Sequence, residues 1–471
     1  MIADLKPYAE YKDSGPPWLG QVPRHWKMHR GKFLFRCKKE LNTDRAHKNV
    51  LSLTLRGVVN NDPDNPEGLV PKDYGTYQLF LKGNLVFKLI DLENLRTSRV
   101  GLVHEDGIMS SAYVRLIPTR DGLQRYFYQQ YFDLYQRGIF NQLGAGVRST
   151  LGSSDLLNLI IAEPPVDEQV AIVRFLDHAT RRLDKAIRDK RKIIALLNEQ
   201  KQAIIHRAVT RGLDPDVPLK DSGIPWLGQM PAHWEVLPVK RCSTVISKGT
   251  TPSTEGRDIL ESGPIRFFKA ENISLFGAGI VDYPRAFIDQ ETHDALRRSQ
   301  LHENDVLFVI AGATLGKIGI VRANHLPANT NQAVAFIRPN KKVTPEFLSI
   351  WLQTSRIREQ IWLNAVQSAQ PNLSMKSLGN FPVPLPSVEE QTAVVQRLDT
   401  ELFIPNTTIS RFEREIELLR EYRTRLIADV VTGKLDVREA AKHLPEIDVA
   451  AAEPDATEPE ESTEELMDED A

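Results

Sequence analysis

The sequence contains little cysteine and no long hydrophobic run. Its two cysteines, Cys37 and Cys242, are too few in 471 residues for a disulfide framework or a cysteine-ligated zinc site. We expect both to be reduced, buried thiols. No run reaches the ~18 apolar residues of a membrane-spanning helix, and the N-terminal MIADLKPYAE lacks the basic start and apolar centre of a signal peptide. These absences predict a cytoplasmic protein without membrane contact.

The sequence also lacks the common motifs of catalysis. It contains no HExxH, no GxSxG and no GxGxxG placed between a strand and a helix. The segment 312–317, GATLGK, superficially matches a nucleotide-binding loop, but only three residues separate its glycines and Ile318 replaces the required Ser or Thr. His25 and His233 lie beside tryptophans, where a structural role is favoured. Glu168 and Glu390 begin helical patterns, where they suit the helix dipole. We expect no catalytic residue, no metal and no cofactor bound by this chain.

Charge is divided unevenly along the chain. The formal net charge is −2. The segment from Glu446 onward holds twelve acidic residues and no Lys or Arg, so the rest of the chain carries about +10. A basic body is typical of a protein that binds a polyanion, although the acidic segment could also serve solubility alone.

The chain is an internal duplication. KDSGPPWLGQVPRHW from Lys12 and KDSGIPWLGQMPAHW from Lys220 agree at twelve of fifteen positions, with an offset of 208. PVDEQVAIVRFLD at 165 matches SVEEQTAVVQRLD at 387, and AVTRGLD at 208 matches VVTGKLD at 430, with an offset of 222. Repeats of this kind determine the architecture before any local pattern is considered. Each half therefore consists of a Trp-rich strap, a variable body and a long helix.

The long helices are predicted from apolar residues at a 4,3 spacing. Residues 168–212 would form a helix of roughly 65 Å at 1.5 Å per residue, and its apolar seam needs a second helix as a partner. The duplicated segment supplies that partner, although Pro405 should kink or break it and leave a long part from about 407 to 432. The predicted seam residues are Leu176, Leu183, Ile187, Ile194, Leu197 and Ile204 in the first helix, and Leu398, Ile409, Ile416, Leu419 and Leu426 in the second.

The two bodies, about 27–164 and 235–386, show short apolar runs separated by turn signals, which is typical of strands. Each also has one predicted helix, at 122–140 and near 345–363. The Tyr and Phe residues of the first helix are more typical of a core than of a base-stacking surface. Prolines in the straps exclude helix there, and Trp18, Leu19, Val22 and Trp26 would dock the first strap onto a surface.

Two similar bodies without a shared catalytic set indicate two binding modules. Bodies held apart by antiparallel helices of ~65 Å would match two patches about two turns of duplex apart, at 34–36 Å per turn. Double-stranded DNA with a two-part site is the polyanion that fits this arrangement.

The motifs, in this order and duplicated, resemble the specificity (S) subunits of type I restriction-modification systems. The resemblance rests on WLGQVPRHW and WLGQMPAHW, GNLVFKLID with GIMSSAYVRL, GATLGKIGIV with NQAVAFIRP, and the helix openings PPVDEQVAIVRFLD and PLPSVEEQTAVVQRLD. It implies a non-catalytic subunit that recognises a bipartite, asymmetric DNA sequence. It also implies two methyltransferase (M) subunits that methylate adenine with S-adenosylmethionine, and restriction (R) subunits that use ATP and Mg. The helices would set the spacer length and dock the M subunits.

Together the patterns and the resemblance predict α/β (α+β) target recognition domains, two in tandem, separated by long helices that form an antiparallel coiled coil with pseudo-twofold symmetry. The predicted boundaries are 1–164 for the first domain with its strap, 165–212 for the central helix, 213–387 for the second domain, 388–437 for the C-terminal helix and 438–471 for a disordered acidic tail.

The DNA-binding candidates are cations and amides in loops, because Arg can pair with guanine, and Asn or Gln with adenine. They are Arg96, Arg99 and Arg148 in the first body, and Lys269, Asn272, Lys317, Arg322 and Gln370 in the second. Each could instead contact phosphate or remain a solvated charge. Two other functions stay open: a specificity subunit whose partner combines methyltransferase and nuclease in a two-sided cutter, and a helical scaffold whose bodies bind protein.

Overall fold

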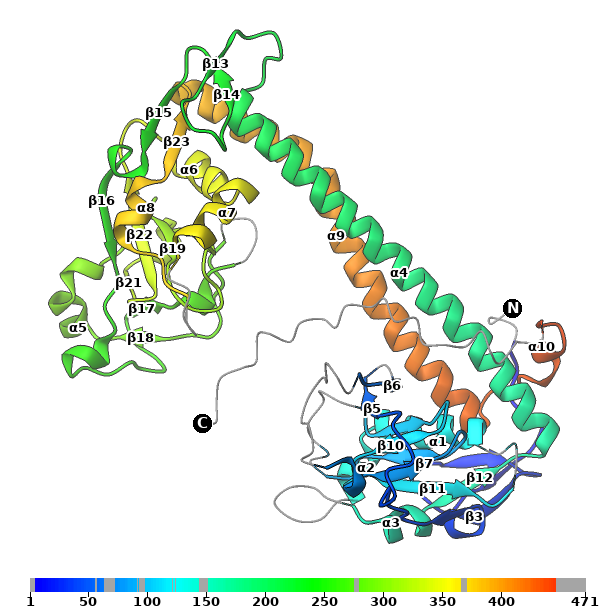
Figure 1. Ribbon diagram of the computed structural model, residues 1–471. Coiled ribbons are helices and arrows are strands. Elements are labelled where there is room, and N and C mark those ends of the chain that lie inside the picture. The colour runs from blue at the N-terminus through cyan, green and yellow to red at the C-terminus, as the bar shows by residue number, and fades with distance from the viewer. Residues whose placement is uncertain are drawn as a thin grey trace. The chain divides into compact units, whose positions relative to one another are not determined.

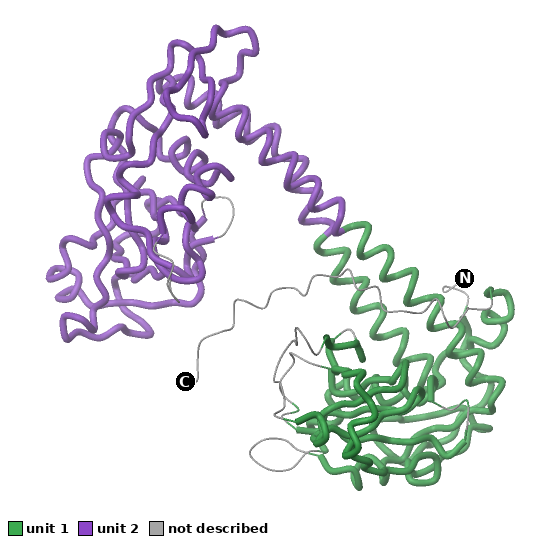
Figure 2. Tube along the Cα trace, in the orientation of Figure 1, with its two compact units in different colours: residues 1–190, 413–458 green, residues 191–412, 459–471 purple. Residues whose placement is uncertain are grey.

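The structure is a computed structural model that describes residues 5–55, 57–62, 73–90, 92, 98–120, 122, 124–143, 151–274, 279–365 and 371–445. The chain divides into two compact units (Figure 2): unit 1 comprises residues 1–190 and 413–458, and unit 2 comprises residues 191–412 and 459–471. Each unit contains one body and parts of the two long helices, α4 (Val166–Arg211) and α9 (Val388–Val431), which Figure 1 labels. None of the helices in the described ranges is long and apolar enough to cross a membrane.

Unit 1 is built mainly of short strands. Its elements are β1 (Tyr11–Asp13), β2 (Gln21–Pro23), β3 (Lys27–Arg30), β4 (Phe35–Cys37), β5 (Leu51–Thr54), β6 (Gly57–Asn60), β7 (Gln78–Phe80), β8 (Leu85–Phe87), β9 (Val100–Leu102), β10 (Gly107–Met109), β11 (Val114–Pro118), α1 (Gln124–Gln136), α2 (Ile139–Leu143), α3 (Ser153–Asn158), β12 (Ile160–Glu163) and α10 (Arg438–Lys442), with the adjoining parts of α4 and α9. Its largest sheet has the strand order β4-β11-β8-β9, and each pair of adjacent strands in this sheet is antiparallel.

Unit 2 repeats this plan with additional elements. They are β13 (Leu219–Asp221), β14 (Gln229–Pro231), β15 (Glu235–Pro238), β16 (Ser243–Lys248), β17 (Ile265–Phe268), β18 (Phe287–Ile288), α5 (Gln290–Ala295), β19 (Val306–Val309), β20 (Ile318–Ile320), β21 (Ala328–Thr330), β22 (Val334–Pro339), α6 (Pro345–Leu352), α7 (Ser355–Asn364), α8 (Met375–Asn380) and β23 (Pro382–Leu385). Its four-stranded sheet has the order β16-β22-β19-β20, again antiparallel throughout.

Each helix predicted within a body is two helices. The one expected at 122–140 ends as α1 at Gln136, and α2 begins after Gly138, which adopts a left-handed φ of +67° that suits glycine. The one expected near 345–363 is interrupted at Thr354, whose hydroxyl caps α7 by accepting from the backbone N–H of Ile357. Tyr126 and Phe127 of α1 are buried, so the prediction that the aromatic stripe belongs to the core is confirmed.

The Trp-rich straps form antiparallel hairpins, β1 with β2 and β13 with β14. Trp26 and Trp234, which follow these hairpins, are 0% exposed. Each strap also packs on the end of a long helix. A Cβ on Gly433, after α9, would lie 2.3 Å from a ring carbon of Pro23, and one on Gly212, after α4, would lie 3.3 Å from Trp234. The glycines that end the long helices therefore permit the close approach of the straps.

The eleven predicted seam residues of α4 and α9 are all buried or half-buried. In unit 1, Leu176 and Leu426 belong to the same hydrophobic core as Trp26. In unit 2, Leu398 is buried in the core that Ile204 packs against. Each body therefore shares one core with the beginning of one long helix and the end of the other.

Three expectations are wrong. Pro405 does not break α9, which is continuous from Val388 to Val431. On one side of the proline Leu402 packs against the unit 2 core, and on the other side Ile409 is 7% exposed. This packing offsets the backbone hydrogen bond that a proline cannot donate. The disordered tail does not begin at 438, because α10 spans Arg438–Lys442 and Leu444 is buried in unit 1. Cys37 is exposed, whereas Cys242 is buried as expected.

Candidate nucleic-acid interface

The four-stranded sheets of the two units place equivalent residues at equivalent positions. Phe87 of β8 pairs with Val100 of β9, and Phe308 of β19 pairs with Ile318 of β20. The residues just before β9 and β20 are Arg99 and Lys317, which sequence analysis chose independently as DNA-binding candidates. The shared topology therefore places one candidate in each body at the same end of that body's four-stranded sheet.

In unit 2 several chain segments meet at this end of the sheet. The backbone N–H of Val309 donates to the carbonyl of Lys317 at 2.9 Å, Gly249 donates to Val334 at 3.0 Å, and Asn331 donates to Phe268 at 3.2 Å. We call residues 248–250, 269–271, 311–317 and 331–333, which contain or adjoin the residues joined by these bonds, the strand-end edge of unit 2. The edge is built from segments that are far apart in the sequence.

Glycines determine how closely this edge is packed and how accessible its loop is. A Cβ on Gly249 would lie 2.0 Å from the carbonyl oxygen of Thr330, so only glycine fits there. Gly312 has a φ of +89° and no atom within 4 Å of its Cβ position. The loop 312–317 joins two antiparallel strands, β19 and β20. It does not precede a helix, so it lacks the helix N-terminus on which a nucleotide-binding loop depends.

The strand-end edge presents cations and an amide to solvent. Lys248 and Gln332 are exposed, and Lys317 is half-buried. The Lys269 ammonium lies 3.7 Å from the Glu271 carboxylate. Lysines in this arrangement can contact phosphates, and a glutamine side chain can donate to and accept from a base edge. Lys248 and Gln332 are not predicted from the sequence, because only the tertiary structure brings β16 and residues 331–333 together.

Two further candidates of the second body do not lie on this edge as free groups. Asn272 is 1% exposed; its amide nitrogen donates to the carbonyls of Val281 and Pro284, at 3.3 and 2.8 Å, and its amide oxygen accepts from the Lys269 N–H. These hydrogen bonds and the burial of the side chain give Asn272 a structural role. Arg322 follows β20, at the opposite end of the sheet, and its guanidinium lies 2.8 Å from the Glu346 carboxylate.

None of the DNA-binding candidates of the first body is a described residue that is exposed on the surface. Arg99 is 0% exposed, so the structure places it in the interior of unit 1 and not on its surface. It lies near Tyr113 and Tyr135, where burial raises the pKa of both phenols and the guanidinium opposes that rise. In unit 1 this position of the sheet is therefore buried, whereas Lys317 at the equivalent position of unit 2 is half-buried. The remaining candidates, Arg96, Arg148 and Gln370, lie outside the described residues.

A second duplicated feature is a carboxylate clamp between strap and helix. In unit 1 the Glu168 carboxylate, 2% exposed, accepts from Trp26 Nε1 at 3.1 Å, from the Tyr8 hydroxyl, and lies 2.8 Å from His25 Nε2. In unit 2 Glu390 accepts from Trp234 Nε1 at 3.1 Å and lies 3.0 Å from a His233 ring nitrogen.

The His, Trp and Glu residues of the clamp occur in the sequence repeats, whereas Tyr8 lies before the first repeat. The sequence pattern alone predicts a helix-dipole role for the glutamates and a structural role in the straps for the histidines. The signal for the clamp was the recurrence of a His-Trp pair and a helix-starting Glu in both halves. The clamp fixes each strap to the first turn of a long helix, and so fixes the body on the helix.

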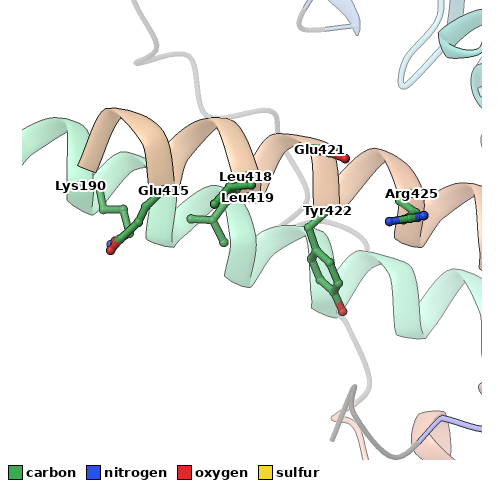
Figure 3. A pocket seen from close by; sticks show the side chains of 7 residues that line it. All are labelled: Lys190, Glu415, Leu418, Leu419, Glu421, Tyr422 and Arg425. Carbon is green, nitrogen blue, oxygen red and sulfur yellow. The ribbon is translucent and has the colours of Figure 1, made fainter. Parts of the chain in front are cut away.

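The part of the helix pair in unit 1 carries an open groove of about 550 Å³ (Figure 3). Its apolar lining includes Leu418 and Tyr422 of α9, which are 48% and 39% exposed. At one end of it the Lys190 ammonium forms an ion pair with the Glu415 carboxylate. The complete lining is Lys190, Glu415, Leu418, Leu419, Glu421, Tyr422 and Arg425. Within the described part of the chain, no group of three or more His, Cys, Asp or Glu side chains could hold a metal.

Comparisons with known proteins give a consistent result. A family model described as the type I restriction modification DNA specificity domain matches residues 36–193 and 231–418. The EcoBI type I restriction enzyme specificity subunit of Escherichia coli is 25% identical over 353 residues, 72% of this chain and 72% of that protein. The putative MjaX specificity subunit of Methanocaldococcus jannaschii is 21% identical over 438 residues, 89% and 96% of the two chains.

The fold is also similar to that of a protein whose structure has been solved. A structure described as the basis of complex assembly and conformational transition of the type I R-M system aligns with a TM-score of 0.64 at 15% identity. The alignment covers 87% of this chain and 98% of that chain. At this identity the similarity concerns the fold.

Proposed function

The chain belongs to the family of type I restriction modification DNA specificity subunits, and from this premise we propose that it recognises a bipartite, asymmetric double-stranded DNA sequence. Specificity subunits are the non-catalytic, DNA-recognition component of type I restriction-modification complexes. The observation that carries the proposal is the duplicated sheet. One four-stranded sheet falls in each stretch matched by the family model, with the same strand order in both units.

Each body reads one half-site with its strand-end edge. In unit 2 the exposed Lys248 and the half-buried Lys317 contact phosphates, and Gln332 faces a base edge. Gly312 lets the DNA backbone approach the main chain closely. The equivalent end of the unit 1 sheet reads the other half-site with different side chains, since Arg99 is buried there. Different side chains on the same framework make the recognised sequence asymmetric.

The helices α4 and α9 form an antiparallel coiled-coil spacer that relates the two halves by pseudo-twofold symmetry. Within unit 1, Lys190 pairs with Glu415, and the Asp184 carboxylate lies 2.5 Å from the Arg423 guanidinium. Residue numbers rise along α4 as they fall along α9, which supports the antiparallel direction. The burial of the seam residues supports the coiled coil.

The partners are two methyltransferase subunits and the restriction subunits, which bind S-adenosylmethionine, ATP and Mg, while this chain binds none of them. The groove with Leu418 and Tyr422 offers the apolar surface on which a methyltransferase subunit docks. The partners methylate adenine and cleave DNA at the direction of this subunit. Because its target is DNA inside the cell, the chain acts in the cytoplasm.

The first experiment maps adenine methylation in DNA from cells that make this chain with its methyltransferase subunit, against a strain lacking the chain. A single two-part motif, absent from the deletion strain, is the expected result. Methylation without a common motif, or none at all, would overturn the proposal.

The strand-end edge is tested by Lys317→Ala, with Arg322→Ala as the matched control because it follows the same strand at the opposite end. Binding of the mapped DNA should weaken for Lys317→Ala, and the slope of log K against log salt should fall by about 1, the value for one phosphate contact. Arg322→Ala should leave the slope unchanged. Equal slopes for both variants would exclude this edge as the DNA surface.

The spacer is tested by inserting seven residues after Leu197, which preserves the 4,3 seam. The methylated motif should keep both half-sites and gain base pairs between them. An unchanged separation of the half-sites would refute the spacer proposal.

A further inference from the structure

The C-terminal end of α7 presents two large apolar side chains to solvent. Trp362 is 47% exposed and Leu363 is 76% exposed, whereas Ile357 and Ile361 on the other face of the helix are buried in the unit 2 core. The other five tryptophans, all within the described residues, are buried or half-buried. Trp362 therefore stands out as the tryptophan that the fold leaves available for binding.

This end of α7 lies beside the strand-end edge. The terminal carbon of Ile361 lies 3.5 Å from the Cβ position of Gly316, the residue before Lys317. Beyond α7, the carbonyl of Pro371 accepts from the N–H of Gly312 at 3.1 Å, so the chain returns to the same loop. The end of α7 that carries Trp362 therefore lies beside the loop that contains Lys317.

The surroundings of Trp362 favour a nucleic acid over a protein as the partner. Lys317 is near this end of α7, and on α7 itself Arg356 and Arg358 outnumber the one carboxylate, Glu359, which lies 3.4 Å from Arg356. Two adjacent apolar side chains are too small for a stable protein interface, which buries about 800 Å² on each partner. An aromatic face beside phosphate-binding cations instead matches the way proteins stack on or wedge between bases.

We propose that Trp362, flanked by Leu363, inserts against the bases of the half-site that unit 2 reads and unstacks one base step there. The inference rests on the proposed function and adds local distortion of the duplex to direct reading of bases. At the 222 offset the equivalent of Trp362 is Phe140, which is 0% exposed. The distortion is therefore confined to one half-site.

The test uses the full chain with its methyltransferase subunits and duplexes carrying 2-aminopurine at successive positions of both half-sites. The variants are Trp362→Ala and Trp362→Phe, with Phe33→Ala as a control that removes an aromatic side chain 64% exposed in unit 1. Fluorescence of 2-aminopurine should rise on binding at one step of one half-site for the unaltered chain and for Phe33→Ala. Trp362→Ala should lose that rise and bind the specific duplex about tenfold more weakly, as removal of one stacking contact does.

The outcomes separate this inference from the proposed function. Trp362→Phe should restore part of the fluorescence rise, and the salt slope should be the same in all variants because no charge is removed. Specific binding by the unaltered chain with no fluorescence rise at any position, or a rise that survives in Trp362→Ala, overturns the wedge alone. Loss of methyltransferase-subunit binding by Trp362→Ala would also overturn it, and would assign this surface to a protein partner. Absence of sequence-specific binding by the unaltered chain would instead refute the proposed function.

Discussion

The carboxylate clamp predicts a difference in stability between the two halves of the molecule. In Glu168→Ala, two buried donors lose their acceptor, Trp26 Nε1 and the Tyr8 hydroxyl, in residues that are 0% and 5% exposed. Each unsatisfied buried donor costs about 1–3 kcal/mol, so unit 1 should lose about 2–6 kcal/mol. Removing the desolvated carboxylate itself offsets part of that loss.

The matched variant in unit 2 should be milder. Glu390→Ala leaves one buried donor, Trp234 Nε1, because the side chain of His233 is 52% exposed and can bind water. The expected cost is about 1–3 kcal/mol. The two variants remove the same group from the same position of two repeats, so their difference measures what the additional donor and the deeper burial of Glu168 contribute.

Glu168→Gln is the control for the geometry of the clamp. Its amide oxygen can still accept from Trp26 and Tyr8, so it should recover much of the stability that alanine loses. In the unaltered chain, burial and the neighbouring Glu168 raise the pKa of Tyr8, which keeps the phenol a donor.

Chemical denaturation combined with hydrogen exchange resolved by peptide measures these effects, because exchange reports local opening in each unit. Protection should fall around β12 and the first turns of α4 for Glu168→Ala, and around β23 and the first turns of α9 for Glu390→Ala. Equal losses for the two alanine variants, or a Glu168→Gln as unstable as Glu168→Ala, would refute the clamp as described.

Three other predictions concern the glycines that end the long helices, the two cysteines and the proline of α9. Gly433→Ala should destabilise unit 1 by about 2–5 kcal/mol, because a left-handed conformation costs an alanine about 1–2 kcal/mol and the crowded methyl group costs about 1–3 kcal/mol more. Gly212→Ala, whose methyl group is less crowded, should cost only about 1–2 kcal/mol. Thermal unfolding measures both losses, and similar losses would contradict the close contact between Gly433 and the strap. Burial raises the pKa of Cys242 to about 11, so at pH 8 a maleimide should label the exposed Cys37 within minutes and Cys242 only on unfolding, as mass spectrometry would report. Pro405→Ala should restore a helical hydrogen bond and stabilise unit 2 by up to about 3 kcal/mol; a lower unfolding midpoint would show that the proline is required where it stands.

Much of the architecture could be predicted because it follows from periodicity and repetition. The 4,3 spacing of Leu176, Ile187 and their neighbours predicts a long helix, and a seam of that kind needs a second helix. The duplicated straps and helix openings, together with their resemblance to a known family, predicted two similar DNA-reading bodies. The prediction of a break at Pro405 is wrong, because packing on both sides of a proline can maintain a helix that its missing N–H alone would end.

The candidate site could not be predicted to the same degree. Arg99 and Lys317 look alike in the sequence as cations beside strands, yet the first is buried in unit 1, while the second lies half-buried on the strand-end edge of unit 2. Asn272 looks like a base-reading amide, yet its side chain is buried and its hydrogen bonds join it to the 281–284 segment. Whether a polar side chain serves the fold or a ligand depends on neighbours that are distant in the chain.

The sequence by itself determined that this protein has two equivalent halves joined by long helices, because repeats and apolar spacing are properties of the chain alone. The tertiary structure decided which groups meet. It brought Lys248, Lys317 and Gln332 to one edge, closed the Glu168 clamp on a strap more than 140 residues away in sequence, and left Trp362 exposed beside that edge. The physical reason is that burial and hydrogen bonding are set by contacts between distant segments, and a sequence pattern records only the near ones.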